Sequence, residues 1–333
     1  MIEQLDNVMN LNPDRRPSAR YKFFIPGRQF LGSGTNALDV SGNAAHAVFG
    51  SSLTDALGWA NNGWLTTATG TNGYAAVPVG SSSFDLSTQS VLFHMRVLKQ
   101  GVVTSENLAG NAQTGTAHQG FYLSLRAGVT GGISKLRPVF RTSGGDFSGL
   151  ADSTATFGDR ALTLSATPAA GATSVTLASN FSGTTGTYQM KFDNGDVRYL
   201  GFTNGSTTVT GVAAGTTALT GACTTAVVVA ADSTYHDITL AIDLVSASQS
   251  VKLYCDGTLS DNYTSSLPTG TTTADTGFAI GGQIGQSGAT STAMKSAGIH
   301  LMAWTGTMPT NIDQIAARLA ANPYQWLTDK DFW

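Results

Sequence analysis

Apolar and polar residues alternate with a period of two along most of the chain. In residues 91–97 the odd-numbered positions are apolar, while His94 and Arg96 fall on the opposite face. The same alternation recurs in residues 121–126, 238–244 and 251–255. The last of these segments ends at Asp256-Gly257, a strong signal for a hairpin turn. Many short strands joined by Gly, Ser and Thr turns predict a β-sandwich or jelly roll.

A period of 3.6 residues is convincing only near the C-terminus. Thr310 is positioned to cap a helix there, with Asp313 three residues later as its capping-box partner. The apolar stripe consists of Ile312, Ile315, Ala316 and Leu319. Asn322-Pro323 then ends the helix. A helix with a single apolar stripe must pack on another layer, so we expect it to lie on the sandwich.

The composition shifts in the middle of the chain. Residues 162–230 contain only four charged side chains: Lys191, Asp193, Asp196 and Arg198. This segment has strand signals of its own, and Asn194-Gly195 predicts a hairpin turn within it. Strand signals of the larger unit resume at Tyr235. We therefore expect the following units: a discontinuous jelly roll of residues 46–160 and 232–308, an inserted small β domain of residues 161–231, and a C-terminal helix and tail of residues 309–333.

Residues 1–45 show no sustained period. They contain Arg15, Arg16 and Arg20, three arginines close together in a chain that is otherwise poor in charge. An irregular N-terminal segment frays unless it is held down. We expect an extended arm that anchors on a neighbouring protein through these arginines; docking on its own domain is the alternative.

Charge and composition exclude several classes of protein. Of the 333 residues 12% are charged, about half the usual share of about 25%. With 41% hydrophobic residues and a net charge of -3, the chain is not of the disordered type. It lacks an apolar run long enough for a membrane span and the features of a secretory signal. Only 18 lysines and arginines argue against nucleic acid as a partner.

The residue types of common catalytic sites are sparse. Glu3 and Glu106 are the two glutamates, and the five histidines form no HExxH motif. No strand carries a pair of carboxylates for glycoside hydrolysis, and no G-x-S-x-G motif occurs. Asp146, Asp152 and Asp159 are interpreted as turn carboxylates rather than Ca²⁺ ligands. Cys223 and Cys255 are expected to be unpaired thiols. We expect no enzyme, no cofactor and no metal.

One loop combines aromatic and amide side chains. Trp59, Asn61, Asn62 and Trp64 lie within six residues of each other. Such a mixture suits a glycan platform, but tryptophan is equally typical of protein contacts. The structural or interface interpretation is favoured, and carbohydrate binding is the alternative.

The order of these strands resembles the concanavalin A-like (laminin-G-like) jelly roll. The matching segments are residues 90–98, 120–125, 236–240, 251–257, 278–282 and 298–304, followed by the helix that ends near residue 324. The hairpin end Leu253-Tyr254-Cys255-Asp256-Gly257 is similar to the one this family favours. Residues 164–173 and 187–198 are similar to small β modules that recur in structural proteins of tailed phages.

Together these resemblances imply a component of a tailed-phage virion that is assembled in the host cytoplasm. Our first hypothesis is a capsid decoration protein that binds the major capsid protein, or another virion protein, and stabilises the head. A homo-oligomer is expected, with a trimer favoured. The alternative is a tail-fibre or receptor-binding protein that recognises a host glycan. A free lectin or a degraded glycosidase is a third hypothesis.

Overall fold

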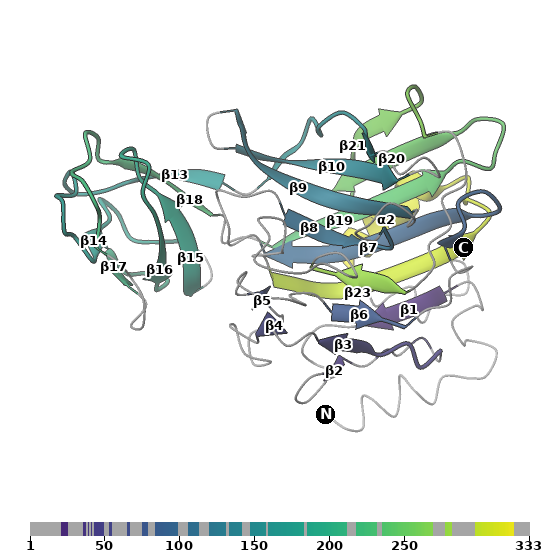
Figure 1. Ribbon diagram of the computed structural model, residues 1–333, viewed down its shortest axis with the longest axis horizontal. Helices are drawn as coiled ribbons and strands as arrows, with labels where there is room; N and C mark the ends of the chain where they lie inside the picture. The colour runs from purple at the N-terminus through teal and green to yellow at the C-terminus, as the bar shows by residue number, and fades with distance from the viewer. Residues whose placement is uncertain are drawn as a thin grey trace.

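The structure is a computed structural model, and it describes most of the strand-forming sequence. The described residues are 21–25, 36–37, 39, 41, 43–49, 53–54, 65–66, 75–78, 84–98, 106–112, 120–130, 133–141, 147–157, 159–182, 185–211, 218–231, 235–268, 277–281 and 297–322. Within them nearly all regular structure is β-sheet (Figure 1). The predicted N-terminal arm around Arg15, Arg16 and Arg20 lies outside the described residues.

The first layer of the larger unit is a six-stranded antiparallel sheet, here sheet A. Its strands, in spatial order, are β1 (Tyr21–Ile25), β23 (Ala297–Gly306), β7 (Ser90–Leu98), β19 (Tyr235–Asp243), β20 (Ser250–Cys255) and β21 (Thr258–Tyr263). Asp256 and Gly257 join β20 to β21 as a two-residue turn, both with positive φ. This is the turn that the Asp-Gly pair predicts.

The second layer is a nine-stranded sheet, here sheet B. Its path runs through β11 (Phe147–Gly149), β10 (Ile133–Arg141), β9 (Gly120–Thr130), β8 (Glu106–Gly110), β22 (Phe278–Ile280), β6 (Ala75–Val77), β3 (Ala47–Phe49) and β2 (Asn36–Ala37). Strand β12 (Thr156–Phe157) adds to β10, and β4 (Leu53–Thr54) pairs separately with β5 (Leu65–Thr66).

The two sheets enclose one hydrophobic core. On β7 the inward residues are Val91, Phe93, Met95 and Val97, as the alternation predicts. Their partners on sheet B include Leu123 and Leu125 of β9, and all of these side chains are buried. The chain is therefore an all-β sandwich of the jelly-roll type, as expected from the sequence.

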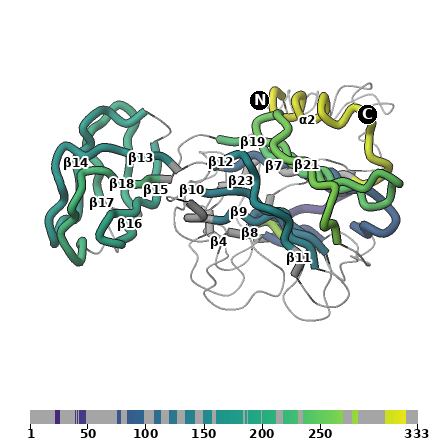
Figure 2. Tube along the Cα trace, turned by 90° about the horizontal axis from the view of Figure 1, so that it is seen from above, coloured from purple at the N-terminus to yellow at the C-terminus, as the bar shows by residue number. Residues whose placement is uncertain are grey.

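Helix α2 (Ile312–Ala321) covers the outer side of sheet A (Figure 2). The predicted stripe is buried against the outward residues of the sheet, which are Phe24, Leu92, Ala241 and Tyr254. No helix of the described chain is long and apolar enough to cross a membrane.

The predicted cap of this helix is wrong. The N-cap is Asn311, and it forms no side-chain capping bond. Asp313 does not bond back to the start of the helix; its Oδ1 instead accepts from the Tyr254 hydroxyl at 2.5 Å and from Lys252 Nζ at 3.3 Å. The helix is therefore tied to sheet A through the very carboxylate that the sequence suggested for its own cap.

A separate sheet is formed between residues 159 and 231. Its strands, in spatial order, are β13 (Asp159–Thr163), β18 (Val227–Ala231), β15 (Gly186–Lys191), β16 (Val197–Phe202), β17 (Thr208–Gly211) and β14 (Val175–Thr176). A bridge between Leu164 and Leu177 joins the two ends, so the sheet closes on itself. It surrounds its own core, which includes Tyr188, Met190 and Phe202. We refer to residues 159–231 as the module.

The module projects from one end of the sandwich and is joined to it through adjacent strands (Figure 1). Asp159 of β13 pairs with Ala231 of β18, so the chain enters and leaves the module side by side. Tyr235, at the start of β19, packs against the module core and lies 5.6 Å from the Arg96 guanidinium. This ring is a direct contact between the module core and the outer side of sheet A.

A second attachment lies just before the module. Thr154 N donates to both carboxylate oxygens of Asp261 at 3.1 and 3.0 Å, and Ala155 N donates to Ser260 Oγ at 3.1 Å. Tyr263 donates to the carbonyl of Ala151 at 3.0 Å. These bonds occupy the edge strand β21, which protects it from pairing with another chain. They also tie the segment that leads into the module to sheet A.

The turn at Gly257 offers a direct test of how α2 is seated. A Cβ at this glycine would lie 2.9 Å from Ala317 Cα and 3.1 Å from Ala320 Cβ, and its φ is +76°. We expect Gly257→Ala to destabilise the protein in urea unfolding by about 1–3 kcal/mol more than Gly195→Ala. Gly195 is the matched control because its φ is +88° and its Cβ would meet nothing. Equal losses of unfolding free energy in the two variants would show that α2 is not in tight contact with this turn.

The domain division is tested by replacing residues 161–231 with a short Gly/Ser linker. Because the ends of the module are paired neighbours, closing the gap costs little loop entropy. We expect the sandwich to keep a cooperative thermal transition and its β-type circular dichroism. Since Tyr235 loses its contact, a lower melting temperature is expected. Loss of cooperative melting would instead show that the two cores form one folding unit.

Candidate functional site: the outer end of the module

At the ends of its strands opposite the Asp159–Ala231 junction, the module is closed by a hairpin turn and a loop, here called its outer end. Strand β13 runs from Asp159, paired with Ala231 at the junction, to Thr163, paired with Val227. Four residues of strand span about 13 Å. The predicted Asn194-Gly195 turn joins β15 to β16 there, beside the loop of residues 218–225 that precedes β18.

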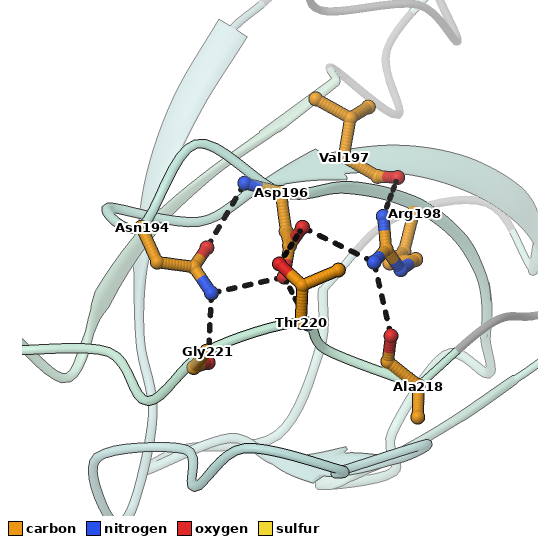
Figure 3. Close-up of polar contacts among 7 residues, drawn as sticks. All are labelled: Asn194, Asp196, Val197, Arg198, Ala218, Thr220 and Gly221. Atoms are coloured by element: carbon orange, nitrogen blue, oxygen red, sulfur yellow. Dashed lines mark hydrogen bonds and ion pairs between the residues drawn. The ribbon is translucent and has the colours of Figure 1, made fainter.

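Asp196 holds this loop against the turn (Figure 3). Its Oδ2 accepts from Thr220 N at 2.7 Å and from Asn194 Nδ2 at 2.9 Å, and its Oδ1 accepts from Thr220 Oγ1 at 2.9 Å. Arg198 Nη2 lies 3.1 Å from Oδ1 and also donates to the carbonyl of Ala218 at 3.0 Å. One carboxylate thus connects the turn, the neighbouring strand and the loop.

Asp193 holds the other side of the loop in the same way, by accepting hydrogen bonds from it. Its Oδ2 accepts from Thr224 N at 2.8 Å, Thr224 Oγ1 at 2.5 Å and Thr225 N at 2.8 Å. The hydroxyl bond from Thr224 is the main cause that holds the pKa of the Asp193 carboxyl well below its usual range. The pKa of Asp196 is also lowered: desolvation opposes the change, and the bonds from Thr220 and Asn194 together with the charge of Arg198 outweigh it.

The surface that results is rigid, polar and nearly neutral. Thr220, Thr224 and Thr225 are exposed, while the carboxylates beneath them are engaged by several donors each. Short hydroxyl side chains on a fixed backbone lose little entropy when a partner covers them. The arrangement therefore suits a contact surface better than proton transfer. No group of three or more potential metal-ligating side chains occurs among the described residues.

A second polar cluster lies on the outward side of sheet A, between the module and α2. His94 is 1% exposed; its Nδ1 is 2.9 Å from Thr239 Oγ1, and its Nε2 is 3.5 Å from Asp237 Oδ1. Asp237 Oδ2 lies 3.8 Å from Arg96 Nε. Nδ1 of His94 has a hydrogen-bond partner, whereas its buried Nε2 has none. His94, Thr239 and Asp237 are buried, whereas the Arg96 side chain is 35% exposed.

The structure leaves the predicted site residues untested. Trp59, Asn61, Asn62 and Trp64 lie outside the described residues, as do Arg15, Arg16 and Arg20. Asp152 does not stand free in a turn, because both of its oxygens accept from Arg126 Nη1 at 3.1 Å. Sequence reasoning missed the outer end of the module as a site. The Asn194-Gly195 turn was visible, but nothing local connects it to threonines some thirty residues away.

No family model matches this chain, and no curated protein matches its sequence. Several solved structures are similar to it. The sialidase of Trypanosoma rangeli matches with 12% identity and a TM-score of 0.47, over 94% of this chain and 34% of the sialidase. The binding domain of Paraclostridial Mosquitocidal Protein 1 matches with 11% identity and a TM-score of 0.48, over 93% and 55% of the two chains. The binding domain of botulinum neurotoxin serotype D matches with 8% identity and a TM-score of 0.47, over 95% and 53%.

These comparisons overturn the expectation that the chain is not an enzyme. The similar structures include an enzyme, the sialidase, and this chain spans about a third of its length. That expectation rested on the lack of a carboxylate pair, whereas sialidases use a tyrosine nucleophile. The absence of such a pair therefore does not exclude catalysis. At this identity the similarity concerns the fold alone and assigns no reaction and no catalytic residue.

The two aspartates give a prediction with a built-in control. Asp196→Ala should increase amide hydrogen exchange at Thr220 but not at Thr224 and Thr225, which Asp193 binds. Asp193→Ala should do the reverse. Because both pKa values are lowered in the folded protein, the stabilisation by the carboxylates is fully present above about pH 4 and is lost progressively as the pH falls from there toward the lowered pKa values. Exchange measured from pH 5 to pH 2.5 should show this loss; uniform exchange in both variants would contradict it.

Proposed function

We propose that the protein is a structural component of a tailed-phage particle, mounted on the head as a decoration protein. The resemblance of its strand order and of its module to phage virion proteins supports this assignment. Its partners in this proposal are the major capsid protein or another virion protein, together with further copies of itself. In this proposal the first twenty residues of the predicted arm anchor the protein to the shell, since residues 21–25 and 36–37 of that arm pair into the sandwich as β1 and β2.

The observation that carries the proposal is the placement of the module. It has its own core, it is joined to the sandwich by paired neighbouring strands, and its outer end is held rigid by Asp193 and Asp196. A unit of this kind adds contact surface without disturbing the main core. Residues 162–230 contain only four charged side chains, and interface cores are likewise depleted in charge. The module therefore suits contact with neighbouring virion proteins.

A receptor-binding protein at the tail fibre, recognising a host glycan, is the second candidate function. It shares the same fold and the same projecting module, so position in the particle separates the two. Immunogold labelling of intact virions should place the protein on the head. Labelling of fibre tips would contradict the decoration proposal and support the second candidate.

Removal of residues 1–20 tests the anchor. We expect the truncated protein to remain folded, with unchanged thermal melting, but to be lost from purified particles in quantitative immunoblots. The matched comparison is the variant without residues 161–231, which keeps the arm and should still attach. Incorporation of the truncated protein at wild-type occupancy would show that the arm is not the anchor.

A further inference from the structure

The chain enters the module from one sheet of the sandwich and leaves it into the other. On the way in, strand β12 pairs with β10 of sheet B, and the module begins at Asp159, two residues after β12 ends. On the way out, Ala231 ends β18, and Tyr235 starts β19 of sheet A by pairing with Leu98 of β7. Asp159 and Ala231 are themselves paired. The direction of the module therefore depends on how the two sheets are held relative to each other at this end.

The segment that precedes β12 is first fixed to sheet B. Leu150 N donates to the carbonyl of Pro138 at 3.0 Å, and Ser153 N donates to the carbonyl of Leu136 at 2.8 Å. Ser153 Oγ in turn accepts from Leu136 N at 2.9 Å. Because Ser153 is 0% exposed, its hydrogen bonds are shielded from competing water. Residues 150–153 thus follow β10 as a firmly bound part of sheet B.

The next two residues cross to the edge of sheet A. Thr154 N donates to both oxygens of the Asp261 carboxylate at 3.1 and 3.0 Å, and Thr154 Oγ1 donates to the carbonyl of Ser260 at 2.8 Å. Ala155 N donates to Ser260 Oγ at 3.1 Å. We call Thr154, Ala155, Ser260 and Asp261 the latch. It joins β21, the edge strand of sheet A, to the segment that is bound to β10 of sheet B.

The latch lies at the surface and contains no part of the hydrophobic core. Thr154 is exposed, and the other three residues are half-buried. None of the four belongs to the core between the sheets. Water can replace hydrogen bonds at such a position, so their net contribution to stability is small. The latch can therefore open while the sandwich and the module both stay folded, as is typical of segments of low local stability.

We propose that the latch sets the direction in which the module projects from the sandwich. When it is closed, it ties the entry segment on sheet B to sheet A, whose strand β19 receives the chain on its return. When it is open, the module is free to swing about its two connections. The Tyr235 ring packs against the module core without a strong directional preference, whereas hydrogen bonds have a fixed geometry. The ring thus keeps the module close, and the latch orients it.

A fixed direction matters for any partner that meets the outer end of the module. A module that is already held in the binding direction loses less freedom on association, so its affinity rises without a new contact. Opening of the latch removes this gain and lets the module follow a partner that moves. The latch acts on the module whatever its partner is, so the inference does not rest on the position of the protein in a particle.

The test measures the distance between spin labels on the module and on the sandwich by pulsed electron paramagnetic resonance of the full chain. The labels are attached to Ser174→Cys in the module and to Gln314→Cys on α2, at two exposed positions. Burial raises the pKa of both native thiols, that of Cys255 to about 12, so the introduced cysteines react first. We expect Asp261→Ala to broaden the distance distribution to about twice its wild-type width.

Two further variants separate the latch from a general effect of removing a carboxylate. Asp261→Asn keeps a side-chain oxygen that can accept from Thr154 N, so its distribution should stay close to that of the wild type. Asp196→Ala removes a carboxylate that also binds a threonine, but at the outer end of the module. The width of the distribution should be unchanged in this control.

Circular dichroism and thermal melting confirm that each variant folds. If Asp261→Ala does not fold, Thr154→Val combined with Ser260→Ala removes the hydroxyl groups of the latch instead and should also broaden the distribution. An unchanged width in the latch variants, an equal broadening in Asp196→Ala, or loss of cooperative melting in both latch variants would each overturn the proposal.

Discussion

The packing of aromatic rings between the two sheets is the interaction on which the rest of the structure depends. Phe278, on the three-residue strand β22, lies 5.1–6.2 Å from four other rings: Phe23, Phe84, Phe93 and Phe121. Two of these come from sheet A, one from sheet B and one from the segment before β7. Rings at these separations contribute about 0.5–1.5 kcal/mol per pair beyond the area they bury. A strand too short to be stable alone is thus held at the centre of the sandwich.

The inner sides of sheets A and B form this shared core, whereas their outer sides have different roles. Sheet A uses its outer side for α2 and for the buried cluster around His94. Sheet B carries its positive charge outward, and its edge leads through Asp152 and Thr154 into the module. The contact surface proposed at the end of the module lies where packing leaves the threonine hydroxyls of the loop exposed. Because the apolar core supplies most of the stability, the outward side chains of the two sheets can serve other roles.

Particular residues show how far sequence reasoning reached. The alternation at residues 91–97 predicted the inward side of β7 correctly, because burial on one face imposes a period of two. The stripe of α2 was also correct, while its cap was not, since Asp313 found a stronger partner in Tyr254. Local sequence could not reveal that competition, because Tyr254 is 59 residues away along the chain. For the same reason the bonds from Asp196 to Thr220 were not foreseen.

The sequence by itself determined the class of fold, the helix, the hairpin turns and the change of composition at the module, because each depends on local periodicity or turn chemistry. Only the tertiary structure decided that the module sheet closes through Leu164 and Leu177, and that Arg137 is fixed beside Gly149. Strand pairing and side-chain contacts join residues that are distant in the chain. Their free energy comes from complementarity in space, which a pattern along one dimension does not contain.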